Sequence, residues 1–427
     1  MEKLSSSFSK LTLPLTLSLK VLRELMSQAI LQNINIYPIK SSAGIELSNS
    51  WVEELGLACD RRFIVANDKG EFITARTHPS LCLIQANLTA KGIMITAPDM
   101  PALLIEYQQL SQNYIAVTVW QDTINAQQCN NNINLWFTRY LKQPCQLLFF
   151  GADSQRFVKN KNSQVGFADG YPLLLISQAS LDNLNSRYKP ETHKISMAQF
   201  RANIVVNNCE AFAEDTWQHI RIGEVEFEIT KPCTRCVFTT VNPETGEKSP
   251  QQEPLKTLKN FRQLANGDIL FGQNLVALNQ GQIKQGDQVE VIKRQTAPTF
   301  TLSNKSSVNP TSNDIKPTLE KETVLSTKTS KPVLTFSSFN KTITGNNTQT
   351  LLEQGEDAGL ILPYSCRAGM CGSCKVMLEQ GEVEQTCQDG LSDQEQQQGY
   401  ILSCCSTPLT DVVISHPARQ RRHIADD

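Results

Sequence analysis

The residues whose type and spacing can do chemistry are cysteines, of which the chain of 427 residues has 13. An odd number excludes complete pairing into disulfides within one chain, and so high a count in a large chain favours metal ligation or catalysis. Four cysteines near the C-terminus are spaced C-x4-C-x2-C, with 29 further residues before the fourth. Four thiolates at this spacing can hold a [2Fe–2S] cluster. They are Cys366, Cys371, Cys374 and Cys404.

Two glycines in the same segment support a cluster. Gly369 and Gly372 lie between the expected ligands. Glycine lets a loop turn its backbone N–H groups toward sulfur, as a loop wrapped around a cluster must do. Zinc is the weaker alternative, because zinc sites normally use two close pairs of ligands.

The fourth ligand is ambiguous, because two cysteines are adjacent. Residues 400–408, YILSCCSTP, resemble the closing segment of plant-type ferredoxins, in which the ligand follows a leucine by two positions. This resemblance selects Cys404 over Cys405. Cys387 follows Cys374 after only 12 residues and is expected to be a bystander.

A second pair, Cys233 and Cys236, lies in KPCTRCVFTT at residues 231–240. C-x-x-C alone is compatible with half of a zinc site, a thioredoxin-like redox pair or two unrelated thiols. The body has no second C-x-x-C to complete a zinc site, and Cys209 is the only other cysteine of the body expected nearby. Residues 237–241 predict a strand, where a thioredoxin motif would open a helix.

Two cations flank this second pair. Lys231 and Arg235 are expected to lower a thiol pKa and to favour the thiolate, the form that binds a metal or attacks a substrate. The segment therefore predicts a reactive cysteine in an anion-binding setting.

The elements that must position these residues are mostly strands. Short runs rich in Ile, Val, Phe and Leu alternate with Gly, Asn and Asp turns, and two stretches have helical spacing. The predicted fold class is α+β and strand-dominated, closer to a β-barrel with accessory helices than to a doubly wound sheet. The expected strands of the body are 33–39, 62–66, 92–97, 114–120 and 220–229, and the expected helices are 177–187 and 254–263.

Residues 295–331 have a different composition, with 14 Ser or Thr among 37 residues. Such a segment cannot bury enough surface to offset its ordering entropy, so it predicts a flexible linker. The module after it has the order of a β-grasp, ferredoxin-like domain. It has an expected hairpin (333–336 and 341–344), a helix (350–358) and two later strands (375–379 and 412–415).

Charge and hydropathy exclude some classes of protein. Lys+Arg 40 against Asp+Glu 42 argues against a nucleic-acid binder with a basic surface. No apolar run approaches the roughly 20 residues of a membrane helix, and no signal-peptide pattern is convincing, so a cytoplasmic protein is expected. Residues 332–418 carry 10 acidic and 3 basic side chains. This acidity suggests docking to a basic surface, or it serves solubility alone.

Residues 231–246, KPCTRCVFTTVNPETG, resemble the signature of MOSC domains, which occur in molybdenum cofactor sulfurases and amidoxime-reducing molybdoenzymes. Further matches follow the family's order, and with the C-terminal module the chain resembles the bacterial YcbX type. The matches are YPIKS (37–41), Asp60-Arg61, FRAN (200–203, with Ala202 in place of proline), Glu214, Asp215, Trp217, FGQN (271–274) and Gly286-Asp287.

The resemblance implies a domain organisation. The predicted segments are an N-terminal extension (1–30), a MOSC N-terminal β-barrel domain (31–150), a MOSC domain (151–294), the linker (295–331), a 2Fe-2S ferredoxin-type domain (332–418) and a basic tail (419–427). A pyridoxal phosphate-binding description of the MOSC domain is also compatible with the resemblance.

The resemblance also implies a molybdenum cofactor (molybdopterin) whose metal is bound by Cys236, since a soft thiolate suits this metal. The phosphate of the cofactor calls for cations and backbone donors. Cys209 and Cys233 are expected to support this site, and residues 169–172 to line the substrate mouth. The residues that match the family's cofactor contacts are Lys40, Ser41, Arg61, Arg201, Asn203, Thr234, Arg235 and Cys236.

Three functions follow as alternatives. The first is a reductase that takes single electrons through the 2Fe-2S cluster and reduces N-hydroxylated compounds, such as hydroxylaminopurines and hydroxylamines, to amines. The second is a carrier of sulfur or of the molybdenum cofactor, and the third is an electron-transfer adaptor. The reductase alone uses both cysteine motifs. Because the chain has no G-x-G-x-x-G and no P-loop, a separate flavin-containing NAD(P)H-dependent reductase is the expected donor.

Overall fold

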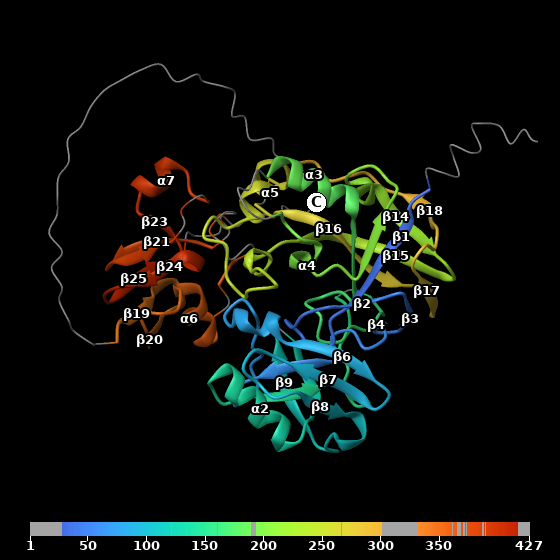
Figure 1. Cartoon of the computed structure of the whole chain (residues 1–427). Helices are drawn as coiled ribbons and strands as arrows, with labels where there is room; N and C mark the ends of the chain where they lie inside the picture. Colours follow the sequence, from blue (N-terminus) through green and yellow to red (C-terminus); the bar gives the residue numbers. More distant parts are fainter. Residues whose placement is uncertain are drawn as a thin grey trace, which may run out of the picture.

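The computed structural model describes residues 28–300 and 331–416, and Figure 1 shows them as a body of strands with a smaller module beside it. The predicted N-terminal extension, most of the predicted linker and the basic tail lie outside the described residues. Also outside are residues 121, 160, 189–193, 266, 361, 365–368, 370, 371, 373, 387 and 389.

The body is built on an eight-stranded sheet in the order β18-β14-β15-β16-β12-β13-β1-β2. Neighbouring strands are antiparallel except β12 and β13. Because β1 pairs with β13, strands hydrogen-bond across the predicted domain boundary at residue 150, which itself stays a prediction. The strands are β1 (Ile30–Ile36), β2 (Ile45–Leu47), β12 (Leu173–Ser177), β13 (Ile204–Asn207), β14 (Trp217–Ile222), β15 (Val225–Thr234), β16 (Leu270–Ala277) and β18 (Val289–Arg294).

Three smaller sheets complete the body. Their orders are β5-β11-β10-β9, β17-β3-β4 and β6-β7-β8. All four residues of β5 are buried, whereas β9 alternates buried and exposed side chains toward its end, as a strand with one solvent face does. The strands are β3 (Asn49–Glu53), β4 (Gly56–Leu57), β5 (Phe63–Ala66), β6 (Gln85–Thr89), β7 (Gly92–Thr96), β8 (Leu103–Glu106), β9 (Tyr114–Val119), β10 (Asp122–Gln128), β11 (Gln146–Phe149) and β17 (Gly281–Lys284).

Two of the body's helices follow the sequence prediction, and one longer helix was missed, as was the short α4 (Met197–Phe200). Helix α3 (Gln178–Arg187) begins after a Ser177 cap, and α5 (Leu255–Arg262) lies within the second expected helix. The missed longer helix is α2 (Asn131–Leu141), whose Asn-rich start reads as a turn. Its signal is the side chain of Asn130, which caps the helix, followed by apolar residues at helical spacing.

Two predictions of a single strand in the body were wrong. Residues 220–229 form a hairpin, β14 and β15, that turns at Gly223, whose φ is +56°. Residues 237–241 begin with the 3-10 helix η4 (Val237–Thr240), because the side chains of Thr239 and Thr240 bond back to carbonyls three residues earlier. Cys236 is the cap of this short helix.

The Glu214-Asp215 segment serves the fold. Asp215 receives two hydrogen bonds from the Arg262 guanidinium, at 2.7 and 3.0 Å, and one from Gln273 at 2.7 Å. Glu214 accepts from the Ser177 N–H and the Ser180 hydroxyl at the start of α3. These buried carboxylates therefore tie α3 and α5 to the large sheet.

Asp215→Ala is expected to lower the free energy of unfolding by about 3–5 kcal/mol, because it leaves the Arg262 charge buried without its carboxylate. Denaturant unfolding measures this. The matched control is Asp182→Ala on α3, where an exposed carboxylate accepts only from Gln178. Equal stability of the two variants would contradict a structural role for Asp215.

The C-terminal module has the expected ferredoxin-like order, with a five-stranded sheet β20-β19-β25-β21-β23 and a small sheet of β22 and β24. Helix α6 (Leu351–Asp357) has the capping box of Thr350 and Glu353. The predicted hairpin, helix and later strands are confirmed. The strands are β19 (Val333–Phe336), β20 (Lys341–Thr344), β21 (Lys375–Gln380), β22 (Val383–Gln385), β23 (Tyr400–Leu402), β24 (Ser406–Pro408) and β25 (Val412–Ser415).

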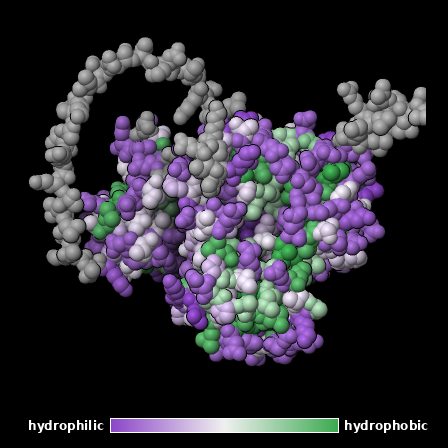
Figure 2. Space-filling model, viewed as in Figure 1, coloured by the Kyte–Doolittle hydropathy of each residue, from purple (hydrophilic) through white to green (hydrophobic). Residues whose placement is uncertain are grey.

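The surface is mostly hydrophilic in the view of Figure 2, with apolar areas over the lower part of the body. In that part, Leu88 on β6 and Leu104 on β8 are exposed. Among the helices that the structure describes, none has both the length and the apolar character needed to cross a membrane.

Candidate metal and cofactor site

A pocket in the body gathers the predicted cofactor residues from four separate stretches of sequence. It lies between the turn after β1, the turn before β5, the end of α4 (Met197–Phe200) and the end of β15. All eight predicted contacts line it, and so do residues 169–171 of the expected substrate mouth. The eight are Lys40, Ser41, Arg61, Arg201, Asn203, Thr234, Arg235 and Cys236.

Backbone conformation aims three of these side chains. Ser41, Arg61 and Arg201 have φ values of 73°, 45° and 57°. A residue other than glycine rarely adopts this left-handed region, and such strain concentrates at functional sites. Arg201 reaches it as the C-cap of α4. The pocket wall is therefore formed by turns that the surrounding strands hold in place.

Arg61 is fixed within the wall. Its Nη1 donates to both oxygens of Asp60, at 2.9 and 2.7 Å, and to Asn203 Oδ1 at 2.8 Å. The guanidinium also lies 4.3 Å from the centre of the Tyr37 ring. Asn203 in turn donates to the Asn35 carbonyl on β1. Arg61 thus connects β1, the turn before β5 and the end of α4.

Arg201 and Arg235 each present an unpartnered nitrogen. Among the described residues, Nη2 of both side chains is buried without a hydrogen-bond partner. Arg201 donates from Nη1 to the Ser42 carbonyl, and Arg235 donates from Nε and Nη1 to the carbonyls of Phe271 and Phe200. A buried donor without a partner is costly, so both nitrogens are prepared for an acceptor in the pocket.

Burial and the neighbouring Arg61 guanidinium lower the pKa of Arg201 to about 10. An arginine destabilised in this way gains most when an anion enters the pocket. A phosphate group would give both Nη2 atoms the acceptors that they lack. The pocket therefore fits the phosphate of the implied cofactor.

The cation on Cys236 is Arg76, which the sequence analysis missed. Arg76 Nε lies 3.4 Å from Cys236 Sγ, and Nη2 lies 2.9 Å from Asp169 Oδ2. Burial lowers the pKa of Arg76, but Cys236 and Asp169 outweigh burial and raise it above its ordinary value. Arg76 belongs to none of the motifs in the sequence. It lies 160 residues before Cys236, so the sequence does not indicate that the two side chains meet.

Cys233 is the other thiol of the motif. Burial raises its pKa, although Arg235 and Lys231 act in the expected direction and lower it. The guanidinium of Arg235 is bound to carbonyls of the wall. Lys231 lies over the ring of Tyr171, 5.6 Å from its centre. Cys209 packs against the core of the large sheet, outside the pocket lining.

Asp169 connects the cations at the mouth of the pocket. Its Oδ1 accepts from Lys40 Nζ at 2.5 Å and from the Trp120 indole at 3.3 Å, and its Oδ2 pairs with Arg76. Burial opposes the charge of Asp169, but Lys40 and Arg76 hold its pKa well below the usual range. Lys40 also donates to the Phe167 carbonyl at 2.7 Å.

Burial lowers the pKa of Lys40 from 10.5 to about 8. Between these values the folded chain binds fewer protons at this site than the unfolded chain, so stability rises with pH. In cofactor-free protein, the free energy of unfolding is expected to rise from pH 8 to 10.5 relative to Lys40→Met, by up to roughly 3 kcal/mol. Denaturant unfolding at a series of pH values measures the difference. Parallel pH profiles for the two proteins would contradict this assignment.

The C-terminal module brings two of the predicted cluster ligands together. Cys374 and Cys404 are buried, with their sulfur atoms 3.1 Å apart. The N–H of Gly369 points at Cys404 Sγ from 3.3 Å, which is the kind of contact expected at cluster sulfurs. Cys366, Cys371 and the bystander Cys387 lie outside the described residues. The two described ligands thus fit a [2Fe–2S] cluster.

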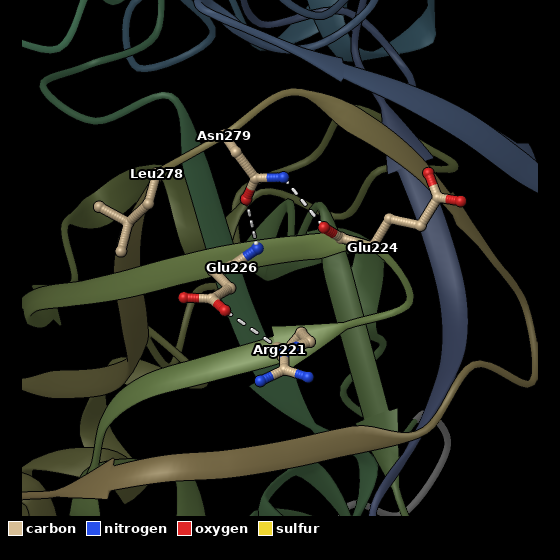
Figure 3. A pocket seen from close by; sticks show the side chains of 5 residues that line it. All are labelled: Arg221, Glu224, Glu226, Leu278 and Asn279. Carbon is tan, nitrogen blue, oxygen red and sulfur yellow. Dashed lines mark hydrogen bonds and ion pairs between the residues drawn. The ribbon is translucent and has the colours of Figure 1, made fainter.

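A second hollow lies on the β14–β15 hairpin (Figure 3), away from both cysteine sites. Its polar groups satisfy one another. Arg221 pairs with Glu226, and the Asn279 amide links the Glu224 carbonyl to the Glu226 N–H. With its thiol and its unpartnered guanidinium nitrogens, the Cys236 pocket is the stronger candidate site.

Three known domain families match the chain. Residues 28–144 match the MOSC N-terminal beta barrel domain, residues 162–290 the MOSC domain, and residues 335–409 the 2Fe-2S iron-sulfur cluster binding domain. Mitochondrial amidoxime reducing component 2 of Rattus norvegicus is 35% identical over 62% of this chain and 84% of its own length. The chain belongs to the MOSC family of amidoxime-reducing components.

Among the relatives of this MOSC protein is mitochondrial amidoxime-reducing component 1 of Homo sapiens, 34% identical over 60% of this chain and 81% of its own length. The likeness to solved structures is local. A crystal structure of Pectocin M2 is 35% identical over 20% of this chain and 32% of its own, with a TM-score of 0.19. The matches to the three domain families and to the amidoxime-reducing components confirm the resemblance of the sequence to the MOSC family and to a ferredoxin-type domain.

Proposed function

We propose that this MOSC protein is a molybdenum-dependent reductase that converts N-hydroxylated compounds to amines with electrons received through its 2Fe-2S domain. The observation that carries the proposal is the pocket itself, in which the Cys236 thiol faces a cation and two buried arginine nitrogens lack acceptors. The names of the relatives support the substrate class, because an amidoxime is an N-hydroxylated amidine.

The chemistry of the donors supports molybdopterin as the occupant of the pocket. Cys236 would supply the thiolate ligand to the metal, since soft thiolates suit it. Arg201 and Arg235 would bind the phosphate with their unpartnered Nη2 atoms. Lys40, Ser41, Arg61, Asn203 and Thr234 would complete the wall around the pterin.

When bound, the cofactor would supply a two-electron redox centre beside the substrate. The chain's own residues bind and orient. Arg76 Nε contacts the Cys236 sulfur at 3.4 Å and places a positive charge beside it. Asp169 fixes Arg76 and Lys40 at the mouth, where residues 169–171 would meet the substrate.

The overall reaction consumes two electrons and two protons, and yields the amine and water from each N–OH group. The cluster delivers electrons one at a time, so two deliveries are needed for each substrate. We propose a separate flavin-containing NAD(P)H-dependent reductase as the source, because the chain lacks the nucleotide-binding motifs for a flavin or nicotinamide domain of its own.

The experiment is to purify the protein from a host that makes molybdopterin, with and without molybdate. Iron and molybdenum are measured by elemental analysis, and benzamidoxime reduction is followed with a chemically reduced artificial donor. We expect both metals in the first sample, iron alone in the second, and turnover only with molybdenum. Iron without molybdenum and no turnover in the first sample would refute the reductase. Bound molybdenum without turnover would instead favour the carrier.

A further inference from the structure

We propose that Trp120 is the residue on which the ferredoxin-type domain docks at the mouth of the Cys236 pocket, and that its indole is the bridge for electrons between the two sites. This inference rests on the proposed function. It begins from an aromatic contact between the two parts of the chain. The ring centres of Trp120 and Tyr364 are 6.4 Å apart, within the range of interacting aromatic pairs.

Tyr364 places this contact beside the cluster. It precedes Cys366, the first expected cluster ligand, by two residues. It follows α6, which Figure 1 shows on the side of the module that faces the body. Tyr364 is therefore adjacent in sequence to the expected ligands, and the contact joins this part of the module to the body.

Trp120 reaches the pocket on its other side. The guanidinium of Arg76 lies 4.6 Å from the centre of the Trp120 ring. Arg76 Nε in turn lies 3.4 Å from Cys236 Sγ. One indole and one guanidinium therefore separate Tyr364 from the thiol that would bind the metal.

The indole is held by the pocket rather than by the module alone. Its N–H donates to Asp169 Oδ1 at 3.3 Å, and Phe72 packs edge-on at 5.1 Å. Trp120 itself has a φ of 58°, a left-handed conformation that is rare for a bulky residue. Strain of this kind persists where the surrounding structure imposes it, and it concentrates at functional sites.

Charge does not explain the docking at this contact. Asp357, at the end of α6, interacts with both Glu71 and Lys69 of the body. Burial and the nearby Glu71 carboxylate raise the pKa of Asp357, although the hydrogen bond from Gln349 lowers it. At this contact Asp357 meets one charge of each sign among the described residues of the body. The aromatic contact is the specific element of the interface.

Each electron would leave the reduced cluster and enter the molybdenum site, with the indole as a bridge that is neither oxidised nor reduced. Electron tunnelling weakens steeply with distance, and bonded or packed atoms carry it better than a gap. Two such electron transfers supply the two electrons that reduce one N–O bond. The electrons come from the donor that reduces the cluster.

The test uses the full-length protein in four forms: wild type, Trp120→Ala, Trp120→Phe and the control Trp51→Ala, which removes an exposed tryptophan on β3. The cluster is reduced chemically, and its reoxidation by benzamidoxime is followed by absorbance in a stopped-flow instrument. We expect Trp120→Ala to slow reoxidation by at least about 10-fold, the scale of a misplaced reacting group, with iron and molybdenum contents unchanged. Trp120→Phe keeps a ring and is expected to stay near the control.

Hydrogen exchange on molybdenum-free protein gives a second measurement that needs no turnover. We expect Trp120→Ala to speed exchange in α6 and in residues 69–72, and Trp51→Ala to leave both unchanged. If the wild-type protein is reoxidised and Trp120→Ala is reoxidised at the same rate, the indole is not the bridge for electrons. Unchanged exchange in Trp120→Ala would overturn the docking. If wild-type protein fails to reoxidise, the proposed function fails, and exchange alone still decides the docking.

Discussion

Cys236→Ser is expected to abolish reduction of N-hydroxylated substrates, with a loss of at least about 100-fold, since even the partners of metal ligands are worth 10- to 100-fold. A serine hydroxyl is a poor ligand for a metal that favours soft donors. It would also leave Arg76 without the sulfur that its Nε contacts at 3.4 Å. Benzamidoxime turnover with an artificial donor measures the effect.

The control for this variant is Cys145→Ser. Cys145 is half-buried, its backbone pairs with the Thr138 hydroxyl, and it does not line the pocket. Both variants should keep the iron content and the visible spectrum of the cluster. Full activity in Cys236→Ser would refute the assignment of this thiol as the molybdenum ligand, and equal losses in both variants would point to a general effect of thiol removal.

Cys404→Ser is expected to remove the 2Fe-2S cluster, and Cys405→Ser to retain it. Cys404 Sγ lies 3.1 Å from Cys374 Sγ and accepts the Gly369 N–H. Both neighbours belong to the buried core of the module, with their sulfur atoms 3.6 Å apart. Oxygen in place of a ligating sulfur weakens the hold on iron. We expect most of the iron to be lost in the first variant and most of it to remain in the second.

Because both cysteines are buried, either serine costs some stability. Thermal unfolding of the two variants therefore accompanies the iron measurement and the visible spectrum. Loss of the cluster from Cys405→Ser alone would mean that the ligand is the second of the two neighbours. The contact of Gly369 with Cys404 would then need another explanation.

Much of the fold was accessible from local patterns. Four strands and one helix of the ferredoxin-like module were predicted, because its strands alternate and its helix carries a capping box, whereas β22, β23, β24 and the short α7 (Asp393–Gln397) were not. The body was harder. Helix α2 begins with asparagines that also favour turns, and the hairpin at Gly223 interrupts a run of apolar residues that reads as one strand. In both places the local sequence is compatible with more than one structure, and tertiary packing determines which one forms.

The cysteines that opened the sequence analysis divide in the same way. The sequence by itself determined the spacing of the cluster ligands and the motif that contains Cys236, since covalent order sets both. Only the tertiary structure decided which cation touches Cys236. Arg76 comes from the turn before η1 (Pro79–Leu83), and Arg235, the neighbour in sequence, donates from Nε and Nη1 to the carbonyls of Phe271 and Phe200. A side chain's partners depend on which turns meet around the pocket, and sequence proximity does not specify them.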